Sequence, residues 1–176
     1  MLGYIISIII LCVLCYQDFK QHEVSLWLLI VLFVMFFMLA YQIENSIIAV
    51  IKNFAINAGF ILMQFLFVKI YFSLRRKQNE PLLDKYIGKG DLLFFLVCCL
   101  AFSVSWFVPF YIGSLSIALL IAIVRNGFQN TKTVEIPLAG IMSFIMVLFI
   151  AVKLMHKSIS FYDEGYLLQL MHMSSE

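Results

Sequence analysis

The stretch Gly88-Lys89-Gly90-Asp91 stands directly before Leu92–Val124, a run of 33 residues without a charged side chain. A membrane-spanning helix needs about 20 apolar residues, so this run is long enough to cross a bilayer and turn back. An aspartate at the mouth of an apolar helix is costly to desolvate, which makes Asp91 a functional candidate. Gly88 and Gly90 have no side chain, so another extended chain could approach the backbone closely here.

The composition of the whole chain agrees with this stretch. The sequence is 64% hydrophobic and 12% charged, with a mean hydropathy of +1.02. A soluble domain is nearer half apolar and a quarter charged. Only helices pair every backbone group within such runs inside lipid, so the sequence predicts an all-α, polytopic integral membrane protein. The lipid bilayer is its expected partner, and the net charge of +2 does not indicate nucleic-acid binding.

Uncharged runs predict the membrane spans. They occupy residues 1–17, 24–43, 53–68, 92–124 and 136–152. We expect the fourth run to turn at Trp106–Gly113, where aromatic residues, proline and glycine are typical of an interfacial turn. This division gives six transmembrane helices in one bundle, a membrane domain over residues 1–157 and a tail over 158–176. The first run lacks a basic start and a small-residue cleavage site, so we interpret it as a retained span.

The basic residues predict the orientation. Loops near residues 18–23, 75–90 and 125–135 hold eight of the twelve lysines and arginines. The positive-inside rule therefore makes that side cytoplasmic and puts both termini and the tail outside. Asp18 ends the first apolar run, and it falls on the same face of the membrane as Asp91.

Two carboxyl groups held close together cannot both ionise easily, so one keeps its proton while the other stays charged. The ionised member can take a proton from water while the neutral member polarises a carbonyl oxygen. Such a pair needs neither a metal nor a nucleophilic side chain. It titrates as a unit, so neither aspartate receives a fixed role.

Three segments carry a resemblance to a known family. Gly88–Asp91 fits a GxGD motif, Asp18–Val24 resembles the segment of a first catalytic aspartate, and Ile136–Ala139 resembles the start of a last span. With these motifs the chain resembles the prepilin peptidases, GxGD-type intramembrane aspartic peptidases related to the preflagellin peptidases. It is similar to their short form, which lacks the methyltransferase loop.

The resemblance implies a catalytic pair, Asp18 and Asp91, without a cofactor. It implies a supporting role for Gly88, Lys89, Gly90, Ile136 and Pro137. The substrates would be prepilin or pseudopilin preproteins, whose basic leader stays cytoplasmic, and components of a pilus or secretion assembly are further expected partners. The chain departs from the family pattern at Ser25, Leu26 and Leu93, which bears on substrate fit more than on catalysis.

Several residues also have simpler interpretations. Asp91 alone is a suitable helix N-cap, and Asp18 alone suits a solvated turn. Cys12 and Cys15 form a CxxC, which we interpret as packing residues in an apolar helix, not as a metal or redox site. His22 would have to join both aspartates to hold a metal, and no further ligand is evident.

Two sets of residues on the spans complete the predictions. Asn53, Asn57 and Gln64 suit hydrogen bonds between helices, or the lining of a wet approach to the acids. The eighteen phenylalanines are expected to face lipid.

Two other classes of function are open at this point. A small proton-coupled carrier would use the acids to bind and release protons, but carriers usually show internal repeats and midplane sites, which are not evident here. A non-catalytic scaffold of a pilus-type secretion assembly would keep the fold without turnover, and loss of either aspartate would favour it.

Overall fold

A computed structural model describes residues 2–21, 23–75, 88–128 and 137–155 of the chain. These residues form six helices without a strand: α1 (Leu2–Gln21), α2 (Leu26–Glu44), α3 (Ile47–Arg75), α5 (Lys89–Ala101), α6 (Val104–Phe128) and α7 (Leu138–Met155). Five are long and apolar enough to cross a membrane, and α5 is shorter. The predicted all-α polytopic bundle is confirmed.

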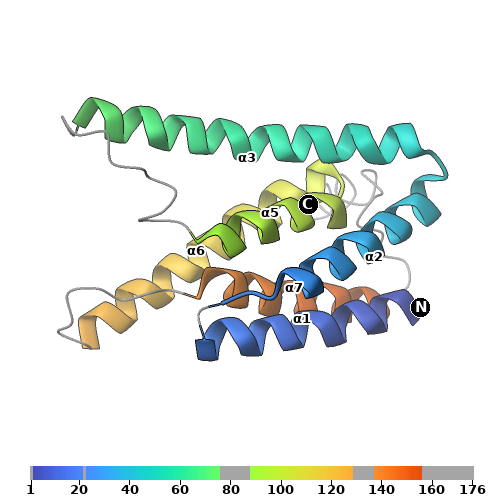
Figure 1. Cartoon of the computed structure of the whole chain (residues 1–176), viewed down its shortest axis with the longest axis horizontal. Helices are drawn as coiled ribbons and strands as arrows, with labels where there is room; N and C mark the ends of the chain where they lie inside the picture. Colours follow the sequence, from blue (N-terminus) through green and yellow to red (C-terminus); the bar gives the residue numbers. More distant parts are fainter. Residues whose placement is uncertain (1, 22, 76–87, 129–136, 156–176) are drawn as a thin grey trace, which may run out of the picture.

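The helices surround the short helix α5. α1 and α7 lie side by side and form the most extensive helix pair, while α3 runs along the opposite side of the molecule (Figure 1). α2, α5 and α6 lie between these two layers (Figure 1). Asp18 lies in the last turn of α1 and Asp91 in the first turn of α5. Both acids are therefore at one end of the bundle, which we call the aspartate end.

α3 is longer than its uncharged run predicts. The run 53–68 is bounded by Lys52 and Lys69, yet both lysines lie within the helix and are exposed. A lysine near a helix end can lay its aliphatic stem along apolar surface and keep its charge in water. Charged residues therefore interrupt the run without ending the helix.

The turn within the fourth run lies earlier than predicted. α5 ends at Ala101 and α6 begins at Val104, so the break falls at Phe102-Ser103 instead of Trp106–Gly113. Pro109 lies inside α6, and the structure has no glycine with a positive φ among the described residues. Proline and glycine are tolerated within membrane helices, which explains why they did not mark the turn.

Asn57 of α3 stabilises this break. Its side-chain amide donates hydrogen bonds to the backbone oxygens of Cys99, at 3.0 Å, and Phe102, at 3.1 Å. The last carbonyl groups of a helix have no N–H partner within it, and here a buried side-chain amide from a neighbouring helix donates to them. The interhelical hydrogen bond predicted for Asn57 is confirmed, and it fixes the end of α5.

The phenylalanines are not all exposed to lipid, and that expectation is wrong. Phe94, Phe95, Phe102, Phe107 and Phe110 are buried in the core. The Phe102 and Phe110 rings lie 4.6 Å apart between centroids, within the range for favourable aromatic pairs. Aromatic side chains from α5 and α6 thus fill the centre of the bundle, where their bulk favours packing over exposure.

The boundary predicted at residue 157 and the tail 158–176 lie outside the described residues, as do His22 and Ile136.

The cysteines of the CxxC differ in exposure, since Cys12 is exposed and Cys15 half-buried.

We expect Asn57→Leu to lower the free energy of unfolding by about 1 kcal/mol, because two helix-ending carbonyl groups lose their donor. Thermal unfolding in detergent micelles measures the change. Asn53→Leu is the matched control, since half-buried Asn53 makes only a 3.4 Å hydrogen bond to Glu44. Equal losses in the two variants would contradict a special role for Asn57.

Candidate active site

Asp18 ends a buried stripe along α1. Ser7, Leu11, Leu14 and Asp18 follow one another at spacings of four, three and four residues, and all are buried. Residues at this spacing share one face of a helix. Because α1 packs most extensively on α7, the stripe carries the Asp18 carboxyl against that helix. Only 4% of Asp18 is exposed, which is unusual for an acid and requires polar partners.

Asp91 lies in the first turn of α5 and faces the same neighbour. The N-cap of α5 is Gly88, so Asp91 occupies the third helical position and is not itself the cap. Its carboxyl accepts a hydrogen bond from the backbone N–H of Gly88. It also accepts one from the backbone N–H of Ala139, with 3.1 Å between nitrogen and Oδ1. Asp91 therefore does more than a helix cap, because it also bonds to Ala139 of a different helix.

The start of α7 supplies donors to both acids. Gly140 donates its backbone N–H to Oδ2 of Asp18, and Ala139, the residue before it, donates to Asp91. The carbonyl group of Pro137 accepts the N–H of Ile141, so Pro137 is the last residue before the helix. The first N–H groups of a helix lack partners within it, and a cap side chain usually accepts from them. Pro137 has no such oxygen, and the two aspartates take its place.

This arrangement brings the two carboxyl groups together. Consecutive residues lie about 3.8 Å apart at their Cα atoms, so acids bound to Ala139 and Gly140 share one small volume. The N-terminus of a helix also carries a partial positive charge that favours bound anions. The start of α7 thus offsets part of the cost of placing acids here.

The glycines of the site provide space. A Cβ atom on Gly140 would lie 3.0 Å from Oδ2 of Asp18 and 3.0 Å from a ring carbon of Phe19. A Cβ on Gly90 would lie 3.2 Å from the Cβ of Val24, and one on Gly88 would lie 3.2 Å from Oδ2 of Asp91. The expectation that Gly88 and Gly90 present bare backbone to another chain is therefore revised, since side chains of this chain occupy that space.

The three departures from the family pattern lie around the site. Ser25 precedes α2 and is half-buried, while Leu26 and Leu93 are 58% and 37% exposed. None of them carries a group that titrates near neutral pH. Leu93 lies two residues after Asp91, and Ser25 directly follows Val24, which lies against Gly90.

The predicted site residues stand as follows. Asp18, Asp91, Gly88, Gly90 and Pro137 gather at the aspartate end. Lys89 begins α5, and Ile136 lies outside the described residues. Sequence reasoning missed Gly140, although a glycine just inside a helix that follows Ile-Pro indicates a close neighbour. Chemically, the pair can share one proton and activate a water molecule.

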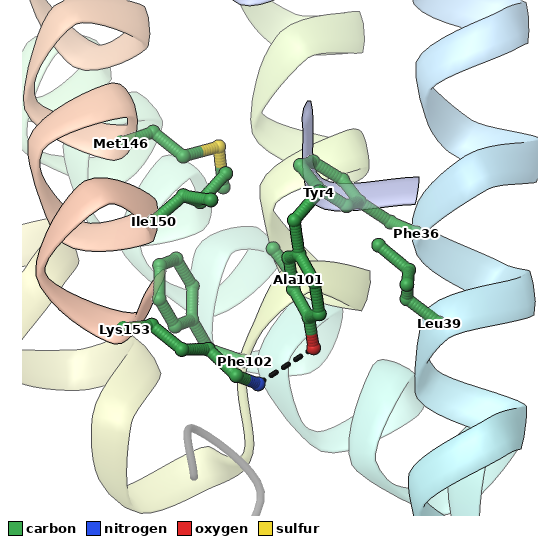
Figure 2. A pocket seen from close by; sticks show the side chains of 8 residues that line it. All are labelled: Tyr4, Phe36, Leu39, Ala101, Phe102, Met146, Ile150 and Lys153. Carbon is green, nitrogen blue, oxygen red and sulfur yellow. Dashed lines mark hydrogen bonds between the residues drawn. The ribbon is translucent and has the colours of Figure 1, made fainter. Parts of the chain in front are cut away.

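Other polar features do not join this site. A pocket lies at the other end of the bundle, where Lys153 donates a 2.6 Å hydrogen bond to the Tyr4 hydroxyl (Figure 2). The remaining side chains that line it are apolar: Phe36, Leu39, Ala101, Phe102, Met146 and Ile150. The described residues contain no group of three or more histidines, cysteines and acids that could hold a metal ion.

Comparison with known proteins gives one match. No curated protein and no solved structure matches the chain. A model of the type IV leader peptidase family matches residues 5–152, which include Asp18, Asp91 and the start of α7. The chain therefore belongs to the type IV leader peptidase family.

Proposed function

We propose that the chain is a membrane-embedded aspartic endopeptidase that removes the short basic leader from type IV prepilin-like preproteins. The observation that carries the proposal is the meeting of Asp18 and Asp91 on adjacent backbone N–H groups of α7. The family match supports a peptidase of this kind. A pair of neighbouring carboxyl groups is the minimal machinery for peptide hydrolysis by activated water.

The proposed reaction uses the pair as one unit. The ionised carboxyl takes a proton from a water molecule as its oxygen attacks the carbonyl carbon of the scissile peptide. The neutral carboxyl donates its proton to the carbonyl oxygen, which gives a tetrahedral intermediate. When the C–N bond breaks, the carboxyl group that took the proton from water gives it to the leaving nitrogen, and the other carboxylate takes a hydroxyl proton from the intermediate, which restores the pair. Either aspartate can hold the shared proton at the start, because the two titrate together.

The start of α7 prepares the pair for this reaction. The N–H groups of Ala139 and Gly140 each donate to one oxygen of a carboxyl group, and the N–H of Gly88 donates to Asp91 as well. Donors that are in place before the reaction need no rearrangement as charge moves. In this proposal Ala139 and Gly140 position the catalytic residues through their backbones.

We further propose that the aspartate end faces the cytoplasm and that both termini lie outside. Lys20 lies in the last turn of α1 and Arg125 in the last turn of α6, so both basic residues belong to the same end as the acids. Arg76, Lys77, Lys85 and Lys132 stand in the sequence between helix ends at this end as well, whereas Lys52 and Lys153 lie toward the other end. A leader that stays in the cytoplasm would then place its cleavage site beside the pair.

We expect Asp18→Asn and Asp91→Asn each to abolish cleavage of a co-expressed preprotein with a pilin-like leader, because an amide cannot exchange the proton. The measurement compares processed and unprocessed preprotein at matched membrane levels of each variant. Glu44→Gln, an acid-to-amide change at the other end of α2, and Lys89→Ala, at the variable position of the motif, should both keep substantial activity. Cleavage at the wild-type rate by either aspartate variant would overturn the two-aspartate mechanism.

Gly140→Ala should lower kcat strongly, since the new methyl group would lie 3.0 Å from the Asp18 carboxyl and from the Phe19 ring. Gly113→Ala is the matched control: it also lies within a membrane helix, and a Cβ there would meet no atom within 4 Å. Purified variants in detergent give kcat, and thermal unfolding gives stability. An unchanged kcat for Gly140→Ala would show that the contact with Asp18 does not position it.

A further inference from the structure

Ser143 of α7 carries a buried hydroxyl group without a hydrogen-bond partner. The residue is 0% exposed, and no described residue bonds to its Oγ atom. A serine within a helix commonly donates its hydroxyl to the carbonyl oxygen four residues earlier. Ser7 and Ser116 do so in this chain, at 2.9 and 2.8 Å. Because a buried polar group without a partner costs free energy, the hydroxyl of Ser143 requires another explanation.

Ser143 lies one helical turn deeper in the bundle than the contacts of both acids with α7. It follows Gly140 by three residues and Ala139 by four, and the N–H groups of these two residues donate to Asp18 and Asp91. Viewed along the helix, position 143 falls between them, about 40° from position 139 and about 60° from position 140. Cα–Cβ bonds in a helix tilt toward its N-terminus, so the Ser143 side chain leans toward the acids.

The side chains of α1 and α5 at this depth are apolar. Leu14 precedes Asp18 by four residues, and Phe94 follows Asp91 by three, so each lies one turn deeper than an acid on the same face of its helix. Both are buried, at 1% and 0% exposure, and both helices pack on α7. On these faces, the nearest strong hydrogen-bond acceptors for Ser143 are therefore the two carboxyl groups.

The distance along α7 indicates an indirect bond. Three or four residues of a helix rise by about 5 to 6 Å, which is longer than one hydrogen bond. A water molecule bridges two polar groups over such a distance at little enthalpic cost. Ala139 and Gly140, the residues above Ser143, are also the two smallest amino acids, so no bulky side chain of α7 separates the hydroxyl from the acids.

We propose that Ser143 is a positioning residue of the acid pair, and that its hydroxyl donates to the pair through one bound water molecule. The inference rests on the proposed peptidase function and adds a third side chain to that site. A donor beside the ionised carboxyl stabilises the singly protonated pair, which is the form that activates the attacking water. Ser143 itself touches no substrate and exchanges no proton.

Ser143→Ala tests the proposal, because it removes the hydroxyl with little change in volume. We expect kcat for a purified preprotein with a pilin-like leader to fall about tenfold and KM to stay nearly unchanged, since a hydrogen bond to a charged group contributes about that much. Thermal stability in detergent should change little, because no described residue loses a bond to the hydroxyl.

Ser7→Ala is the matched control. Ser7 is equally buried, at 0% exposure, but it precedes Asp18 by eleven residues, or about 16 Å along α1. We expect kcat near the wild-type value, although this variant loses the bond to the Gly3 carbonyl group. Ser143→Cys separates volume from chemistry, since a thiol fills the space of a hydroxyl but donates weakly. It should lower kcat as Ser143→Ala does.

The dependence of kcat/KM on pH is the second measurement. Without the donor the ionised carboxyl is less favoured, so Ser143→Ala should lose activity on the acidic side at a higher pH than wild type does. Other charged or titratable residues near the acids are the same in both proteins and affect both profiles alike. On the helices around the pair and directly before them, these are Cys15, Tyr16, Lys20, Glu23, Lys89 and Arg125, while His22 and Glu135 lie outside the described residues.

The outcomes separate the two proposals. Cleavage by wild type in the same assay tests the peptidase function alone. If wild type cleaves and Ser143→Ala keeps both its kcat and its pH profile, the role of Ser143 is overturned and the function stands. The same conclusion follows if Ser7→Ala loses as much kcat, if Ser143→Cys restores it, or if kcat falls while the pH profile stays in place. Absence of cleavage by wild type removes the function, and the inference falls with it.

Discussion

The rest of the structure depends on the N–H groups of Ala139 and Gly140 at the start of α7, which have no acceptor within that helix. Pro137, the residue before that helix, has no side chain that could accept from them, and acids from two other helices do so instead. An acceptor side chain at the start of α7 itself would have bonded these N–H groups without any other helix. Because the partners come from α1 and α5, one helix start joins three segments that are far apart in the sequence. The position of each acid therefore depends on the packing of all three helices.

That dependence explains several features that otherwise look unrelated. Gly140 is small because Asp18 and Phe19 lie against it. Asn57 holds the end of α5 that lies farthest from Asp91. The contact of Gly90 with Val24 joins the start of α5 to the segment that follows Asp18, so the two aspartate motifs support each other. Lys153 and Tyr4 tie α1 to α7 at the opposite end of the same pair.

Much of this arrangement could be predicted from the sequence, because apolar runs and the order of spans are one-dimensional properties. The spans of α1, α2 and α7 follow from uncharged runs, and an even number of crossings put Asp18 and Asp91 at one end. The break at Phe102-Ser103 could not be found, since an asparagine from another helix stabilises it. The partners of the acids were also missed. They are backbone groups, which every residue has, and only the packing of the helices decides which ones are near.

The shortness of α5 has a consequence for the depth of Asp91. Its 13 residues span about 20 Å, whereas the hydrocarbon core of a bilayer is about 30 Å thick. A short helix in direct contact with lipid would thin the bilayer around it, but α5 lies among other helices and most of its side chains from Phe94 to Leu100 are buried, so protein and not lipid surrounds its ends. Because Asp91 lies in the first turn of α5, the length of this helix sets the depth at which the acid lies among its longer neighbours.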